Sequence, residues 1–256
     1  METGLPRATL SIVIPIKDEE ATLVELIDLV ERAEVPDVDK EIVIVDDGST
    51  DATASLLDGY RNRPGFVVID HPTNHGKGAA IRSALGAVTG DVVVIQDADH
   101  EYDPSDFASL IAPILDGRTR VVYGSRFLGT VQGMAWPNRV ANKILSGAAS
   151  LIGNSRVTDE ATCYKAFDAT LLRALPLRCR GFEFCPEVTG LLQGLDEPIV
   201  EVPISYVGRG RDAGKKVRAK DGFIAITWLL WSRFGRRAER ARVRTIAPAG
   251  RVTVSL

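Results

Sequence analysis

Two carboxylates stand close together directly after a run of strand-forming residues. Residues 91–95 are apolar after the first position, and Gln96-Asp97-Ala98-Asp99 follows them. Side chains at i and i+2 of an extended segment point to the same side. Two such carboxylates repel each other unless a cation neutralises them, and Mg²⁺ or Mn²⁺ prefers oxygen ligands. The spacing therefore predicts a metal site at Asp97 and Asp99 of the kind that bridges two phosphate oxygens, as in an enzyme acting on a nucleotide diphosphate.

The segments around this tetrad alternate between strand and helix patterns. Strands are expected at residues 10–15, 41–46, 66–69 and 91–95, with helices at 19–33, from about 51 to before 64, and at 77–88. The first helix has apolar residues at helical spacing, namely Leu23, Leu26, Ile27 and Val30. Near-continuous apolar strands between amphipathic helices predict an α/β fold with a mostly parallel sheet covered on both faces. Ligands of such sheets bind beyond the carboxyl ends of the strands.

The second half has less regular patterns. A strand is expected at 121–127, a helix at 138–152, and a strand at 199–206 whose proline suggests an edge or a bulge. A glycine-rich basic loop at 208–221 precedes a last helix at about 222–240 and a loose tail after about 242. We expect one catalytic domain over residues 1–220 and a C-terminal amphipathic helix with its tail over 221–256.

Composition narrows the class of protein. The chain has 256 residues, of which 45% are hydrophobic and 25% charged, as in ordinary globular proteins. A formal net charge of -3 gives no support for nucleic-acid binding. The cysteines, Cys163, Cys179 and Cys185, fit no disulfide framework or zinc spacing. The sequence shows no signal peptide and no apolar stretch of about 20 residues, so we expect a cytoplasmic protein with membrane contact only at its surface.

Seven short motifs follow one another in a specific order. They are IPxxDE (15–19 with the preceding Ile14), VDDGSTD (45–51), NHGKGAAIRSAL (74–85), QDADHEYDP (96–104), VVYGSRFLG (121–129), DEATCYKAF (159–167) and EVPISYVGRGRDAGKK (201–216). This ordered set resembles the family 2 glycosyltransferases with a GT-A (Rossmann-like) fold. It is most similar to the branch that transfers a hexose to dolichyl or polyprenyl phosphate. The resemblance covers about residues 10–233.

The resemblance implies roles on the donor side of the site. Asp97 and Asp99 would hold the metal and Ala98 would lie with them in the donor site, with Glu101 as a third ligand where the family often has glutamine. Asp47 would accept a hydrogen bond from the nucleotide base, although its turn is also a good helix entry. The base and ribose pocket would further be lined by Pro15, Lys17, Glu19 and Val45. The family usually has an aromatic or small polar residue at the place of Lys17.

Basic residues are expected to contact the phosphates. Lys77 follows a glycine turn that lacks the Walker spacing, and it opens a helix whose N-terminus favours anions. By resemblance, Arg209 and Lys216 contact the donor diphosphate, and Arg126 helps to hold donor or acceptor. A solvated basic loop is the alternative for the segment that carries Arg209 and Lys216.

The acceptor is inferred from a missing base. A sugar hydroxyl needs a general base, whereas a lipid phosphate is already largely ionised at pH 7. No dedicated base is evident, and Asp159 or Glu160 occupies about the place where hydroxyl-using relatives keep theirs. We therefore expect an inverting transfer of a hexose, mannose or glucose, from a GDP- or UDP-sugar to a polyprenyl phosphate. The alternative is a family 2 enzyme with a hydroxyl acceptor, a soluble metabolite or glycan, and Asp159 as catalytic base.

The last helix bears on the same question. Its aromatic residues Phe223, Trp228, Trp231 and Phe234 stand beside a run of arginines from Arg233 to Arg244. Such a combination suits an anionic membrane surface and a protein peripheral at its inner face, and a core-packing or dimer helix is the alternative.

Two other classes of protein fit the sequence less well. A sugar nucleotidyltransferase needs a glycine- and arginine-rich turn where this chain has Pro15 to Glu19, and a non-catalytic binding module needs no intact metal motif.

Overall fold

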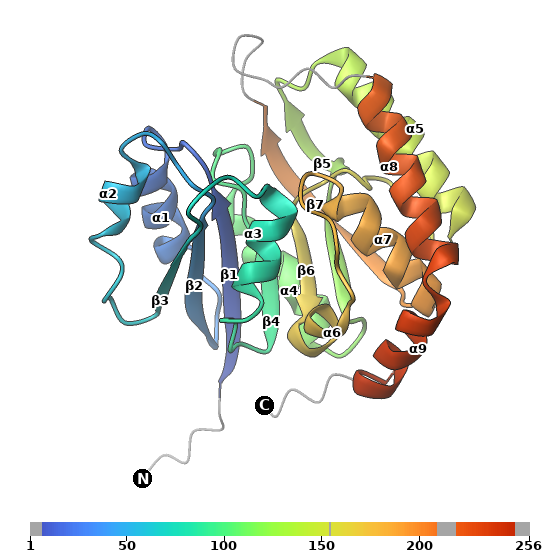
Figure 1. The fold of residues 1–256 in the computed structure, drawn as a ribbon, viewed down its shortest axis with the longest axis horizontal. Coiled ribbons are helices and arrows are strands. Elements are labelled where there is room, and N and C mark those ends of the chain that lie inside the picture. The colour runs from blue at the N-terminus through green and yellow to red at the C-terminus, as the bar shows by residue number, and fades with distance from the viewer. Residues whose placement is uncertain (1–6, 154, 209–218, 249–256) are drawn as a thin grey trace.

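A computed structural model describes residues 7–153, 155–208 and 219–248 of the chain. Within these residues the strands form one sheet in the order β3-β2-β1-β4-β6-β5-β7 (Figure 1). The strands are β1 (Ala8–Ile16), β2 (Val38–Asp46), β3 (Phe66–Asp70), β4 (Val92–Ile95), β5 (Val121–Gln132), β6 (Lys165–Asp168) and β7 (Ile199–Val207). All strand predictions are confirmed in place. β6 was not predicted, because only its two central residues, Ala166 and Phe167, are apolar and they form no apolar run.

The sheet is mostly parallel, as predicted. β1 pairs in parallel with both β2 and β4, and β2 pairs in parallel with β3. β6 is the exception, because it runs antiparallel to both β4 and β5. β7 lies at the edge, and its register against β5 shifts after the Ser125–Pro203 pair, which confirms the edge or bulge expected from the proline.

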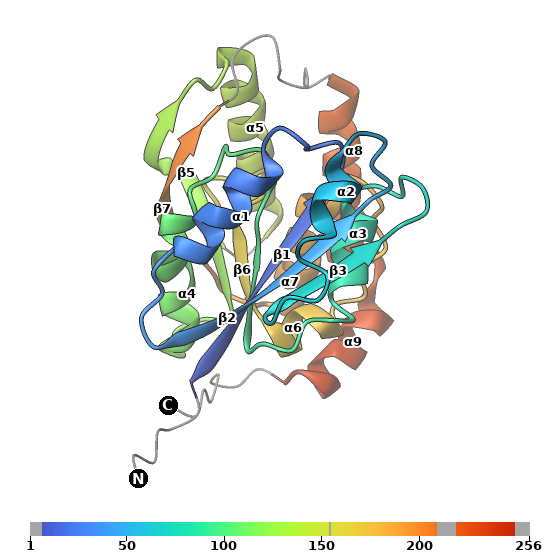
Figure 2. The ribbon, with the colours of Figure 1, turned by 90° about the vertical axis from the view of Figure 1, so that its left-hand side faces the viewer.

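Helices cover both faces of the sheet (Figure 2). One face packs on α1 (Leu23–Arg32), α2 (Thr53–Leu57) and α4 (Phe107–Leu115), the last preceded by the short turn η1 (Pro104–Asp106). The other face packs on α3 (Lys77–Ala84), α6 (Ala169–Ala174) and α7 (Phe184–Leu195). Alternate residues of β2 divide between the two layers, since Ile42 and Ile44 enter one core and Val43 and Val45 the other.

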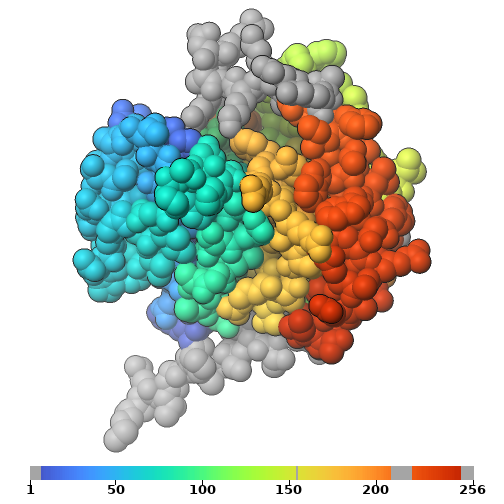
Figure 3. Space-filling model, viewed as in Figure 1, coloured from blue at the N-terminus to red at the C-terminus, as the bar shows by residue number. Residues whose placement is uncertain are grey.

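The C-terminal segment packs as a further layer on α7. It comprises α8 (Ala219–Leu230), the π-helical turn η2 (Trp231–Gly235) and α9 (Arg237–Ile246). α8 also contacts α5 (Trp136–Ile152), and these C-terminal helices form one flank of the molecule in Figure 3. The expected single helix is therefore interrupted, and the loose tail expected after residue 242 is wrong as far as Ile246. The division of the chain at residue 220 stays a prediction.

Two of the arginines expected on a membrane face belong to the interior. Arg236 pairs with Glu187 of α7 at 2.7 Å, and both side chains are buried. The Glu187 carboxylate also accepts the backbone N–H groups of Arg178 and Cys179 at 2.8–3.0 Å. Arg240 is 7% exposed and donates to the Ser232 carbonyl at 2.7 Å. These arginines fasten the C-terminal helices to α7 and hold the turn at residues 178–179.

None of the described helices is long and apolar enough to cross a membrane.

Arg236→Ala is expected to lower the free energy of unfolding by about 3–5 kcal/mol, because it leaves the Glu187 carboxylate buried without its cation. Urea denaturation measures the loss. Arg244→Ala serves as the matched control, since Arg244 pairs with Asp196 at an exposed site and should change stability by less than about 1 kcal/mol. Equal effects of the two substitutions would contradict the structural role of Arg236.

Candidate active site

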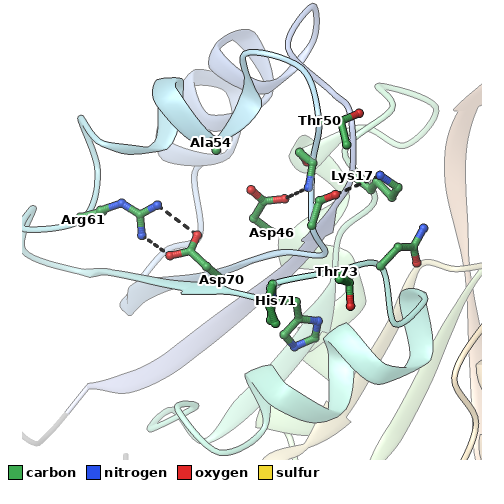
Figure 4. Close-up of a pocket in the computed structure, with 12 residues that line it drawn as sticks. Lys17, Asp46, Thr50, Ala54, Arg61, Asp70, His71 and Thr73 are labelled. Atoms are coloured by element: carbon green, nitrogen blue, oxygen red, sulfur yellow. Dashed lines mark hydrogen bonds and ion pairs between the residues drawn. The ribbon is translucent and has the colours of Figure 1, made fainter.

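Polar side chains gather beyond the carboxyl ends of β1, β2, β3 and β4. A pocket of about 500 Å³ lies beyond the first three strands (Figure 4). Its lining comprises Lys17, Asp46, Gly48, Ser49, Thr50, Ala54, Arg61, Asp70, His71, Pro72, Thr73 and Asn74. One side of the pocket is bounded by a bidentate ion pair, in which Arg61 Nη1 and Nη2 donate to the two Asp70 carboxylate oxygens at 2.6 and 3.0 Å. The pocket has room for a nucleoside, and the Asp97 segment follows the next strand along the sheet.

The two neighbouring aspartates at the end of β2 have different surroundings. Asp46 lines the pocket, and its Oδ1 accepts the Ser49 N–H at 2.9 Å. Asp47 instead accepts three hydrogen bonds, from His71 Nδ1 at 2.7 Å, from the His75 N–H at 2.9 Å and from the Gly76 N–H at 2.6 Å. Burial alone would raise the pKa of Asp47, but these hydrogen bonds outweigh it and lower the pKa below its ordinary value. In this conformation Asp47 holds the loop after β3, and its predicted contact with the base stays untested.

The N-terminus of α3 is closed by backbone, so the expected open anion site is wrong for this conformation. The Gly78 N–H donates to the Gly181 carbonyl at 3.1 Å, and the Ala79 N–H donates to the Arg180 carbonyl at 3.0 Å. This approach requires glycine, because a Cβ on Gly76, at φ 95°, would lie 2.4 Å from the Arg180 oxygen. The glycines that suggested a phosphate turn therefore admit a neighbouring segment of the chain.

Lys77 contacts the predicted metal motif in this structure. Its ammonium forms an ion pair with Asp97, and both side chains are mostly buried. Burial would lower the pKa of Lys77, but the Asp97 carboxylate raises it well above its ordinary value. Lys77 thus supplies the positive charge that the sequence led us to expect from a metal.

The remaining predicted metal ligands lie close by along the same loop. The Glu101 N–H donates to Asp99 Oδ1 at 3.3 Å, and Glu101 Oε2 accepts the Tyr206 hydroxyl at 2.9 Å. Among the residues that the structure describes, three His, Cys, Asp or Glu side chains are nowhere assembled as a ready metal site. Carboxylate oxygens still suit Mg²⁺ or Mn²⁺, which commonly binds through one or two carboxylates together with substrate phosphates. The donor set therefore fits a metal that arrives with the diphosphate.

Arg126 of β5 and Asp159 form a buried ion pair. Arg126 Nε and Nη2 donate to the two Asp159 oxygens at 2.7 and 2.8 Å, and the Arg126 N–H donates to Oδ2 at 3.0 Å. Asp159 is fully buried and Arg126 is 6% exposed. A carboxylate held in this way is placed to orient a guanidinium, because both of its oxygens accept hydrogen bonds from Arg126.

Of the other residues predicted to bind the sugar-nucleotide donor, some line the pocket and others belong to the core or to the ends of elements. Lys17 lines the pocket and donates to the Gly48 carbonyl at 3.1 Å. Pro15, Glu19 and Val45 are not part of the pocket lining. The Val45 side chain is fully buried in the hydrophobic core, so the expectation that it lines the base pocket is wrong. The Glu19 carbonyl accepts the Leu23 N–H at 2.9 Å at the start of α1. Ala98 is buried beside the metal motif, and Arg209 and Lys216 lie outside the described residues.

Sequence reasoning placed Asp46 at this edge without giving it a role, and it missed two further polar residues. They are His71 and Tyr206, each at or directly after the last residues of a strand. His71 could have been found from its place after the apolar run 66–69, because parallel strands end at one edge. Tyr206 ends the strand predicted at 199–206, but its partners Glu101 and Arg126 come from distant parts of the chain.

Glu160, next to Asp159, is a buried acid with an unusual environment. It is fully buried, and neither carboxyl oxygen has a hydrogen-bond partner among the described residues. The Lys165 ammonium donates to the Glu160 backbone carbonyl at 2.8 Å. Burial raises the pKa of Glu160 to about 8, with the positive charge of Lys165 opposing the shift. Glu160, the residue after Asp159, therefore stays mostly protonated at neutral pH.

Comparison with known proteins assigns this architecture to a family. The profile of "Glycosyl transferase family 2" matches residues 11–175, well over half of the chain. The chain therefore belongs to glycosyl transferase family 2, and its sheet and helices form the GT-A fold of such enzymes. The expected family and fold class are confirmed.

Several relatives are named as transferases of a sugar to a dolichyl or undecaprenyl phosphate. The dolichol-phosphate mannosyltransferase of Pyrococcus furiosus is 27% identical over 80% of this chain and 58% of its own length. An undecaprenyl-phosphate 4-deoxy-4-formamido-L-arabinose transferase of Pseudomonas fluorescens is 31% identical over 80% of this chain and 59% of its own length. This chain thus spans about six-tenths of both. The UDP-N-acetylglucosamine–dolichyl-phosphate N-acetylglucosaminyltransferase of Methanococcus voltae is 26% identical over 88% of this chain and 96% of its own length.

Solved structures confirm the fold. Glucosyl-3-phosphoglycerate synthase from Mycobacterium tuberculosis, in complex with Mn²⁺, UDP-glucose and phosphoglyceric acid, superposes with a TM-score of 0.63. It is 26% identical, and the match covers 89% of this chain and 80% of that one.

Glu160→Gln is expected to stabilise the fold at pH 8 but hardly at pH 4.5. The unfolded acid ionises near 4.5 and the folded one near 8, so wild-type stability is lost as the pH rises through this range. The difference from wild type should grow by up to ~1.4 kcal/mol per pH unit and then level off. Urea denaturation between pH 4.5 and 9 measures it, with the exposed Glu34→Gln as control. A difference independent of pH would refute the raised pKa.

Proposed function

We propose that this protein is an inverting, metal-dependent glycosyltransferase that moves a hexose from a nucleotide diphosphate sugar to a polyprenyl phosphate. The observation that carries this proposal is the buried pair of Arg126 and Asp159. Asp159 is the base that the hydroxyl-acceptor alternative requires, and Arg126 donates a hydrogen bond to each of its two oxygens. An acceptor that is already ionised needs a cation and orientation, not a base.

The donor would bind across the ends of the first four strands. The nucleoside would lie in the pocket beside Lys17 and Asp46, with its diphosphate directed toward Asp97 and Asp99. Mg²⁺ or Mn²⁺ would be held by Asp97 and Asp99, with Glu101 as the third ligand, and it would supply Lewis-acid neutralisation of the leaving diphosphate. The family relatives that take UDP-sugars support this class of donor, and GDP-sugars belong to the same proposal.

Lys77 would change partners as the donor binds. Its ammonium neutralises Asp97 in this structure, and the two side chains are mostly buried together. When Asp97 turns to a divalent cation, the ammonium loses its carboxylate but gains a diphosphate within the same loop cluster. A lysine that exchanges one anion for another keeps a partner for its mostly buried charge in both states.

The acceptor phosphate would be held by Arg126. Nε and Nη2 of the guanidinium face Asp159, which leaves the Nη1 side for a phosphate oxygen. Asp159 fixes the plane of the guanidinium, so the acceptor oxygen would approach the anomeric carbon in one orientation, opposite the leaving nucleotide. Inversion at that carbon follows from a single displacement.

Exposed apolar residues of α5, α8 and η2 suit the lipid part of such an acceptor. α5 and α8 lie side by side, and their exposed large apolar residues are Trp136, Ile144, Leu151, Phe223, Ile224, Leu230, Trp231 and Phe234, the last two in η2. Phe223 is 74% exposed and Leu151 is 88% exposed. With Lys143 and Arg237 also exposed, this surface supports peripheral contact with an anionic membrane at its inner face.

The alternative is a family 2 enzyme with a hydroxyl acceptor. The structural match to a synthase whose complex contains phosphoglyceric acid favours it. Its catalytic base would have to be Asp159, which requires that Arg126 first release a fully buried carboxylate. The cost of separating a buried pair, about 3–5 kcal/mol, weighs against this alternative.

Transfer of radiolabelled hexose from GDP- or UDP-sugars into an organic-extractable product should depend on polyprenyl phosphate and on Mn²⁺ or Mg²⁺. Asp99→Asn should lower kcat by at least roughly 100-fold, because charge neutralisation by a metal contributes several kcal/mol. Asp116→Asn, at an exposed ion pair, is the matched control. Absence of transfer to any polyprenyl phosphate would overturn the proposal, and transfer to phosphoglycerate would support the alternative.

The wild-type protein is expected to sediment with vesicles that contain an anionic phospholipid. Replacing Phe223 and Phe234 by serine should weaken this binding roughly tenfold or more, because each buried aromatic side chain contributes 1.5–3 kcal/mol. Serine at Val24 and Leu29, exposed apolar residues of α1, provides the control. Equal losses in both variants would place the membrane contact elsewhere.

A further inference from the structure

Tyr206 lies where the donor and acceptor parts of the site meet. It stands one residue before the end of β7 and is 7% exposed. Its hydroxyl donates to Glu101 Oε2 at 2.9 Å, and the Arg126 Cζ atom lies 5.1 Å from the centroid of its ring. One side chain therefore contacts both a candidate metal ligand and the cation proposed for the acceptor.

The backbone around this contact is fixed to the metal loop. Tyr206 forms an antiparallel bridge with Tyr102, and the Val207 N–H donates to the Glu101 carbonyl at 3.0 Å. The Ser205 N–H donates to Asp106 Oδ2 at 2.7 Å. The Tyr102 ring packs edge-on against the Tyr206 ring, with centroids 5.4 Å apart. These contacts hold the hydroxyl at a set position relative to the loop that carries Asp97, Asp99 and Glu101.

We propose that Tyr206 is a positioning residue whose hydroxyl orients the Glu101 carboxylate toward the divalent cation while its ring holds the Arg126 guanidinium. This inference rests on the proposed function. Hydrogen bonds to a metal-binding carboxylate fix its direction, and their loss commonly weakens metal binding 10–100-fold. The face of the ring attracts the guanidinium, so one tyrosine sets the spacing between the two halves of the site.

Tyr206→Phe separates the two roles, because it removes the hydroxyl and keeps the ring. With UDP or GDP present, electron paramagnetic resonance of free Mn²⁺ should show about tenfold weaker Mn²⁺ binding than in wild type. Nucleotide binding without metal, followed by thermal shift, should be unchanged. In a Glu101→Gln background the same substitution should cause less than the tenfold loss, since contacting residues are not additive.

Tyr164→Phe is the matched control. The Tyr164 hydroxyl donates to the Asp103 carbonyl at 2.8 Å in the same aromatic cluster, but its ring neighbours Tyr102 and not Glu101. This variant should keep wild-type Mn²⁺ affinity, and equal melting temperatures would establish that both variants fold. Two results would overturn the inference about Tyr206 but not the proposed function. One is an unchanged Mn²⁺ affinity in Tyr206→Phe, and the other is a loss of Mn²⁺ affinity that is equal in the wild-type and Glu101→Gln backgrounds. Absence of nucleotide-dependent Mn²⁺ binding in wild type overturns the proposed metal-dependent function itself.

Discussion

Negative charge gathered at the carboxyl edge of one sheet is the constraint on which the rest of this structure depends. Parallel pairing of β1, β2, β3 and β4 brings Asp46, Asp47, Asp97 and Asp99 to one side of the molecule. Such a cluster is stable only when each carboxylate has a cation or hydrogen-bond donors. The chain meets this need with Lys77 at Asp97, with three donors at Asp47, and with Arg126 at Asp159 farther along the sheet.

These partners come from helices and turns that the C-terminal layer holds in place. The turn at residues 178–181 closes the start of α3, which carries Lys77, and Glu187 of α7 binds that turn through its N–H groups. Arg236 in turn neutralises Glu187 beneath α9. The distant C-terminal helices are thus connected through buried charges to the lysine at the metal motif. This explains why arginines that resemble a membrane-binding run are partly interior.

Much of the donor side could be anticipated from the sequence. The i, i+2 spacing of Asp97 and Asp99 after an apolar strand, together with the order of the motifs, was enough for the family and the GT-A fold, and the family match bears this out. The strands with continuous apolar runs were predicted in place, and so were helices at the positions of α1, α3 and α5. The helices α4, α6 and α7 were not predicted, nor were β6 and the turn η2, which are short and have no apolar period of their own.

Local pattern by itself determined which residue types this protein places at strand ends, since alternation along a strand depends only on the backbone. Only the tertiary structure decided their partners. It assigned Val45 to the core, turned Asp47 toward the loop after β3, locked Asp159 to Arg126 and set Tyr206 between Glu101 and Arg126. The physical reason is that each of these contacts joins residues far apart in the chain. Their distance depends on sheet order and on the packing of helices, which no single segment encodes.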